Sequence, residues 1–70
     1  MKLSARNVLK GKVVEIVKGA VTSHVRIDIG EGSVITAAIT NEAVAELGLT
    51  VGSAAAAVIK ASDVMVGVDD

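Results

Sequence analysis

The chain has 70 residues, a length that allows one small domain. It contains seven basic and eight acidic side chains and lacks Cys, Phe, Trp and Tyr. The missing cysteines exclude disulfides and thiolate metal sites, and a formal net charge of −1 argues against a general attraction to nucleic acid or to an anionic membrane. Barrels that bind single strands also use aromatic stacking platforms, which this sequence does not contain.

The first part of the chain predicts two β-strands. Residues 8–17 are rich in β-branched side chains and predict the first strand, in which Gly11 marks a bulge or a bend of the kind found at a barrel corner. A turn at residues 18–20 leads into the second strand, residues 21–29, where apolar and polar side chains alternate. This alternation places on one face the apolar side chains of Val25, Ile27 and Ile29, and on the other His24, Arg26 and Asp28.

A third strand and a short helix are expected next. The glycine-rich residues 30–33 predict a hairpin connection with positive φ angles, and residues 34–40 predict the strand that follows it. Either Thr40 or Asn41 is suited to cap the N-terminus of a helix, which Gly48 should end in a left-handed conformation.

Two more strands are expected after this helix. Residues 54–59 combine four alanines, which favour a helix, with a β-branched end, and we interpret them as a buried strand. Residues 64–68 predict the last strand. The chain is therefore expected to be all-β with one short helix: an OB-like Greek-key β-barrel of about five strands, in a single domain over residues 1–70.

The composition also predicts self-association. The chain is 51% hydrophobic, with a mean hydropathy of +0.63, which is more apolar material than so small a monomer easily buries. Small domains without disulfides or a structural metal are commonly stabilised by association, so we expect a homo-oligomer. Residues 1–7 do not resemble a signal peptide and no apolar run could span a bilayer, so we expect a cytoplasmic location.

No residue pattern in the chain is typical of an active site. His24 is the single histidine and stands on the polar face of its strand, where we expect it to be solvated or at an interface. One histidine without cysteines cannot form a zinc site. We therefore expect a protein that is not an enzyme and that supplies no direct ligands to a metal ion.

Two short polar clusters predict anion binding. One precedes the first strand and the other follows the strand at 54–59, and together they comprise Ser4, Arg6, Asn7, Lys60, Ala61 and Ser62. A guanidinium group, an ammonium group, hydroxyls and backbone N–H groups are the donors that hold a dianion. Because neither cluster contains an acidic residue, the set favours a fully deprotonated oxyanion over phosphate, which keeps a proton. The alternative is that these are ordinary surface and turn residues.

Several motifs in fixed order carry a resemblance to a known family. They are Ser4-Ala5-Arg6-Asn7, Lys10-Gly11-Lys12-Val13-Val14, the segment 17–22, Ala38-Ile39-Thr40, Glu46-Leu47-Gly48-Leu49, the turn at Gly52 and the segment 58–65. In this order, and in a chain of this length, they resemble the molbindins, also called Mop domains. The resemblance covers residues 1 to about 68.

The resemblance implies an OB-like barrel whose subunits exchange strands in a homohexamer, a trimer of dimers. It also implies that molybdate or tungstate is held intact at subunit interfaces, without an organic cofactor. The family's ligand positions match Ser4, Arg6, Lys60, Ser62, the backbone N–H of Ala61 and, from a neighbouring subunit, Thr40. Further candidates are Asn7 and, for sites near a symmetry axis, Lys18, Gly19, Ala20 and Thr22.

The function we expect is therefore intracellular binding, storage or buffering of molybdate or tungstate, without chemistry on the oxyanion. The alternative is an oligomerising interaction or regulatory module, of the kind fused to molybdate-responsive regulators and transporter ATPases, with no storage role. In either case the expected partners are the oxyanion and further copies of the chain, and neither nucleic acid nor a membrane.

Overall fold

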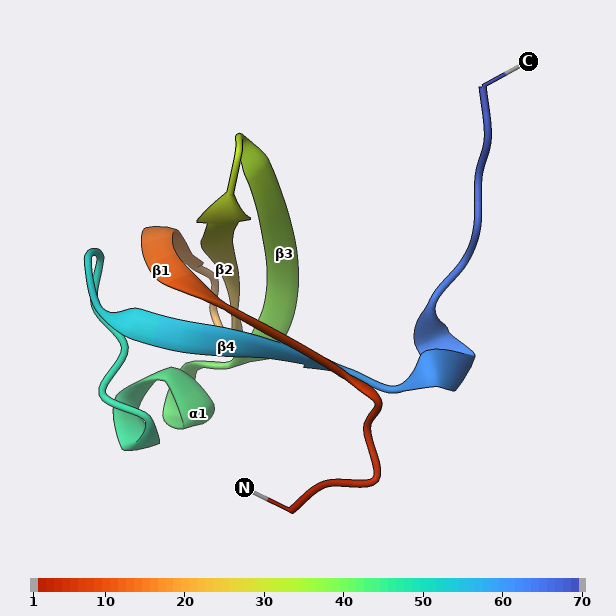
Figure 1. The fold of residues 1–70 in the computed structure, drawn as a ribbon. Coiled ribbons are helices and arrows are strands. Elements are labelled where there is room, and N and C mark those ends of the chain that lie inside the picture. Colours follow the sequence, from red (N-terminus) through yellow and green to blue (C-terminus); the bar gives the residue numbers. More distant parts are fainter. Residues whose placement is uncertain (1, 70) are drawn as a thin grey trace.

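The computed structural model describes residues 2–69, so Met1 and Asp70, the two ends of the expected domain, lie outside the described residues. The fold is a four-stranded antiparallel sheet in the order β3-β2-β1-β4, curled into a half-barrel, with one short α-helix below it (Figure 1). This confirms the prediction of a mostly β fold with one helix. The elements are β1 (Asn7–Lys18), β2 (Thr22–Gly30), β3 (Ser33–Thr40), α1 (Asn41–Glu46), β4 (Ala54–Ile59) and the 3₁₀ helix η1 (Ala61–Asp63).

The long strand β1 curls the sheet because it pairs with a different neighbour along each half. Residues 7–12 pair with β4 and residues 12–18 pair with β2. A Cβ atom added at Gly11 would lie 2.2 Å from the backbone oxygen of Asp28, so glycine permits a close approach of β2 at this bend. The shift in register falls between Val13 and Glu15, a little beyond the predicted position.

The concave side of the sheet carries the core. The buried apolar residues are Val13, Val25, Ile27 and Ala57. The alternation predicted for β2 is confirmed, since Val25 and Ile27 are buried while His24 and Arg26 are exposed. The inward-facing side chains of the sheet therefore supply the four buried apolar residues, against which Val44 of α1 and Leu49 also pack.

Both predicted glycine turns are confirmed. The β2–β3 hairpin has positive φ angles at Gly30, Glu31 and Gly32. Gly48 follows α1 with φ 63°, and Leu49 then packs against the core. The first turn lies before β3, and the second lies after α1 and leads the chain back toward the sheet.

The prediction of a strand at residues 64–68 is wrong. After η1 the chain runs away from the sheet (Figure 1), and Met65, Val66 and Val68 are 87–93% exposed. A strand needs the N–H and C=O groups of a neighbour for its ladder, and η1 directs this segment away from both edges of the sheet. Within residues 2–69, one copy therefore has four strands, not about five.

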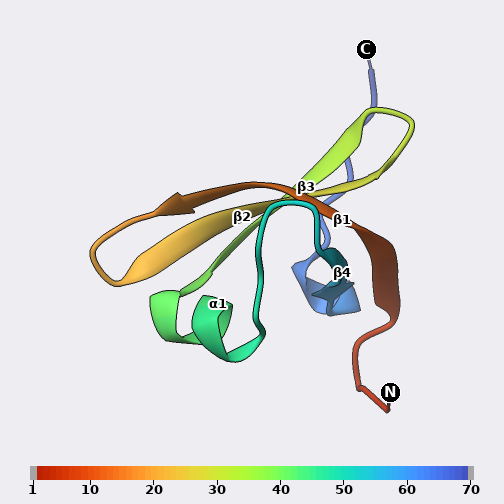
Figure 2. The ribbon, with the colours of Figure 1, turned by 90° about the vertical axis from the view of Figure 1, so that its left-hand side faces the viewer.

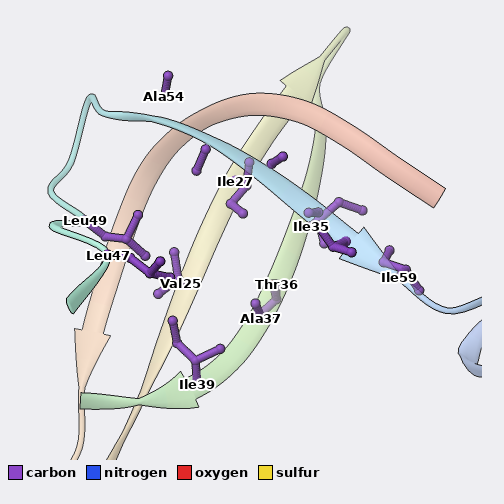
Figure 3. Close-up of a pocket in the computed structure, with 14 residues that line it drawn as sticks. Val25, Ile27, Ile35, Thr36, Ala37, Ile39, Leu47, Leu49, Ala54 and Ile59 are labelled. Atoms are coloured by element: carbon purple, nitrogen blue, oxygen red, sulfur yellow. The ribbon is translucent and has the colours of Figure 1, made fainter. Parts of the chain in front are cut away.

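The half-barrel leaves an apolar groove open between its two edge strands, β3 and β4. The groove has a volume of 670 Å³, and side chains such as Ile35, Ile39, Leu49 and Ile59 point into it (Figure 3). Its described lining carries no charged side chain. No helix within residues 2–69 has the length and apolar character to cross a membrane.

Candidate functional site

The pairing of β1 with β4 brings the two predicted anion-binding clusters together. The last pair of this ladder is Asn7 with Ile59, and the Asn7 Nδ2 atom donates to the Ile59 carbonyl at 3.1 Å. The chain before Asn7 and the chain after Ile59 therefore leave the sheet on adjacent strands, whose usual spacing is about 4.8 Å. Arg6 and Lys60 are the first residues beyond that pair, so two cationic side chains start from the same end of one ladder.

The cluster around Lys60 offers backbone donors as well as side chains. In η1, the N–H groups of Asp63 and Val64 donate to the carbonyls of Lys60 and Ala61, at 2.9 and 3.3 Å. Within residues 2–69, the N–H groups of Ala61 and Ser62 make no hydrogen bond. These N–H groups and the exposed Ser62 hydroxyl are therefore available to a ligand.

The remaining members of the set are exposed in one copy. The exposed positions are Ser4, Arg6, Lys60, Ala61 and Ser62, and Asn7 is half-buried against β4. The hydrogen bond from Asn7 to Ile59 uses the side-chain amide within the fold. Asn7 therefore links the ends of β1 and β4 through its side chain.

Thr40 and the turn at residues 18–20 lie at the other end of the sheet. Thr40 pairs with Thr22, and Lys18 pairs with Ser23. Figure 2 shows the β1–β2 turn and α1 on one side of the molecule and the N-terminal segment and η1 on the other. One copy does not bring Thr40 to Arg6 and Lys60, so a site that contains all three needs at least two copies.

The structure shows how the Thr40 hydroxyl is oriented. Thr40 is the N-cap of α1, which decides between the two predicted caps, and its Oγ1 atom accepts from the Ala43 N–H at 3.0 Å. A hydroxyl whose oxygen accepts a hydrogen bond still has one proton to donate. Thr40 is exposed, so this proton can reach a ligand outside its own copy.

A polar network near the β1–β2 turn was missed by the sequence reasoning. Ser23 is 1% exposed, and its hydroxyl donates to the Asn41 Oδ1 atom at 2.5 Å. The Asn41 Nδ2 atom in turn donates to the Gly19 carbonyl at 3.0 Å. The signal was present, because Ser23 shares the period-two face of Val25 and a buried hydroxyl requires a partner.

His24 and Arg26 take no part in either cluster. His24 is exposed on the convex face, opposite Val17 and Ala38. Arg26 forms an exposed ion pair with Glu15 at 3.4 Å. Among residues 2–69, no three His, Cys, Asp or Glu side chains gather as a cation site.

Comparison with known sequences places residues 3–66 in the TOBE domain family. The chain is 56% identical over 69 residues to a probable molybdenum-pterin-binding protein of Haemophilus influenzae, covering 99% of this chain and 100% of that relative.

Two solved structures share the fold. One is MopII from Clostridium pasteurianum in an apo form, with a TM-score of 0.88 and 46% identity, covering 96% of this chain and 100% of that one. The other is the cytoplasmic molybdate-binding protein ModG with molybdate bound, with a TM-score of 0.93 and 52% identity. It covers 99% of this chain but 49% of the ModG chain, so the present chain corresponds to half of that protein.

Proposed function

The chain belongs to the molbindin (Mop) family of TOBE-domain proteins, and from this premise we propose that it binds and stores molybdate or tungstate, as intact oxyanions, at interfaces between its copies in the cytoplasm. It acts as a binding protein and not as an enzyme. The observation that carries the proposal is the end of the β1–β4 ladder, where Arg6 and Lys60 leave the sheet together.

The donors at this ladder end suit a tetrahedral dianion. Arg6 offers a guanidinium fork, Lys60 an ammonium group, and Ser4 and Ser62 offer hydroxyls. Two cations that start from adjacent strands repel each other, and a dianion compensates both charges at once. Sulfate carries the same charge, so selectivity for the larger molybdate rests on the size of the cage.

A second copy completes the cage in this proposal. Thr40 comes from the neighbouring copy, since it lies at the far end of its own sheet. The turn at residues 18–20, together with Thr22, supplies further contacts where several copies meet. Closure of the interface removes water, which strengthens each charge-assisted hydrogen bond to the anion.

The open groove and the exposed C-terminal segment support assembly by strand exchange. Residues 64–68 are mostly apolar and lie far from their own sheet, while the groove between β3 and β4 is apolar and presents two unpaired strand edges. We propose that this segment of one copy adds as a strand to the groove of another, in a homohexamer built as a trimer of dimers.

Native mass spectrometry and calorimetry test the proposal. Molybdate should bind in a fixed ratio to the oligomer, and Arg6→Ala and Lys60→Ala should each weaken binding at least tenfold while the sheet stays folded. Arg26→Ala is the matched control, because it removes an exposed arginine from the convex face. Equal binding of sulfate and molybdate, with assembly intact, would favour the interaction module, and binding of single-stranded DNA instead of molybdate would overturn both.

A further inference from the structure

We propose that Asn41, oriented by Ser23, is a positioning residue that aims the Ala20 N–H at a bound oxyanion. The inference rests on the proposed function, because it concerns the turn at residues 18–20 as a contact segment. It assigns Asn41 no contact with the anion. Its part is to fix the direction of a backbone donor on another element.

Asn41 holds two of the three carbonyl groups of residues 19–21, which connect β1 to β2. Its side-chain amide donates to the Gly19 carbonyl at 3.0 Å, and its backbone N–H donates to the Val21 carbonyl at 2.8 Å. Carbonyl oxygens carry partial negative charge and repel an anion. By accepting from Asn41, both oxygens are turned toward α1 and away from the outer side of the turn.

Because of peptide geometry, the hydrogen bond from Asn41 to the Gly19 carbonyl also sets the direction of the Ala20 N–H. The peptide between Gly19 and Ala20 is trans, so its C=O and N–H groups point in opposite directions. Because Asn41 holds the Gly19 oxygen on the inner side, the Ala20 N–H points to the outer side. Within residues 2–69 this N–H makes no hydrogen bond, and Ala20 is exposed.

Ser23 fixes which end of the Asn41 amide faces the turn. Its buried hydroxyl donates to Oδ1, so the NH₂ group is left to face Gly19. Without Ser23 the two ends of the amide could exchange, and a carbonyl would then face the Gly19 oxygen. Ser23 is the one buried polar side chain among the described residues. Its contact with Asn41 explains why a hydroxyl occupies this buried position.

The turn has little freedom to compensate. The Gly19 N–H donates to the Thr22 carbonyl at 2.8 Å, and a Cβ atom at Gly19 would lie 2.7 Å from that oxygen. Lys18, the first residue of the turn, is exposed and carries an ammonium group. A single outward N–H beside a cation is a small donor set, so its direction matters to the strength of binding.

Nitrogen-15 NMR of the assembled protein tests the inference. Sodium molybdate is titrated into the wild type, Asn41→Ala and Ser23→Ala, and the amide signals of Ala20 and of Ala61 are followed. In the wild type both signals should shift with molybdate. In Asn41→Ala the affinity reported by Ala20 should fall about tenfold, the scale of one hydrogen bond to a charged group, while Ala61 responds as in the wild type. In Ser23→Ala the molybdate affinity reported by the Ala20 signal should also fall.

A matched control separates positioning from loss of stability. Val44→Ala loosens the packing of α1 on the core but removes none of the hydrogen bonds that join Ser23, Asn41 and Gly19. In this variant the molybdate affinity reported by the Ala20 signal should therefore stay at the wild-type level. A hollow of 270 Å³ beside Asn41 admits water in place of the lost amide, which favours folding of Asn41→Ala.

The outcomes are distinct. If neither Ala20 nor Ala61 responds in the wild type, the proposed function fails. If Ala61 responds in the wild type but Ala20 does not, or if Asn41→Ala leaves the Ala20 response unchanged, the inference fails and the proposed function stands. The inference is also overturned if the molybdate affinity reported by Ala20 falls equally in Val44→Ala and in Asn41→Ala.

Discussion

Replacing Thr40 separates two tasks that its hydroxyl performs in the proposal, capping α1 and donating to the oxyanion of a neighbouring copy. Thr40→Val removes both. Loss of the cap, which accepts from Ala43 at 3.0 Å, should cost about 1 kcal/mol of unfolding free energy. That lowers the melting temperature by roughly 4–8 °C for a domain of this size, compared at one protein concentration. Loss of a hydrogen bond to a charged ligand, about 1.5–3 kcal/mol, should weaken molybdate binding roughly 10- to 150-fold.

Thr40→Asp distinguishes the two tasks. Aspartate caps a helix at least as well as threonine, so the melting temperature should stay near that of the wild type. Its carboxylate, however, would face the dianion. Two like unit charges at about 4 Å near a protein surface repel by about 4 kcal/mol, which is roughly a 1,000-fold loss of affinity. Calorimetry with molybdate measures the affinity, and thermal unfolding by circular dichroism measures the stability.

Thr40→Ser is the control, because it keeps a hydroxyl in the same place and should preserve both properties. The reasoning is refuted if Thr40→Asp binds molybdate as tightly as the wild type, since Thr40 would then lie away from every bound anion. It is also refuted if Thr40→Val loses stability but no affinity.

Three further predictions concern the scaffold. Gly11→Ala should destabilise the fold by about 1–3 kcal/mol in chemical denaturation, because its Cβ would meet the Asp28 oxygen, and an unchanged midpoint would contradict the close approach of β2. Arg26→Ala should change stability by less than about 1 kcal/mol, since its ion pair with Glu15 is exposed on both sides, and a larger loss in the same denaturation assay would show that the pair is shielded. Val66→Asp should shift sedimentation toward smaller species, because it adds a charge to a segment proposed to enter an apolar groove, and an unchanged distribution would place assembly elsewhere.

Local patterns were sufficient to predict β1 to β4 and the helix. The alternation through Val25 and Ile27 is a property of β2 alone, and Gly48 ends α1 for a reason that lies in its own backbone. Residues 64–68 have the same β-branched character but form no strand in one copy. Composition shows that a segment can form a strand, whereas formation depends on a neighbour that local sequence does not specify.

The candidate site divides in the same way. The residue types of Arg6 and Lys60 indicated anion binding, but their meeting depends on the register that pairs Asn7 with Ile59, a contact between residues 52 positions apart. The polar network around Asn41 was missed for a related reason. As a candidate helix cap it had a sufficient local role, and its contacts with Gly19 and Ser23 appear only when β1, β2 and α1 are packed together.

The open edge of β3 has a consequence for the abundance of this protein in a cell. No charged side chain occurs from Ser33 to Asn41, so nothing discourages a wrong chain from pairing there before assembly. Under the proposed assembly, a newly made copy at low concentration is accordingly exposed to proteases and chaperones until it meets other copies. In the proposed assembly, the assembled amount rises more steeply than the rate of synthesis, so a modest change in expression becomes a larger change in the proposed storage capacity.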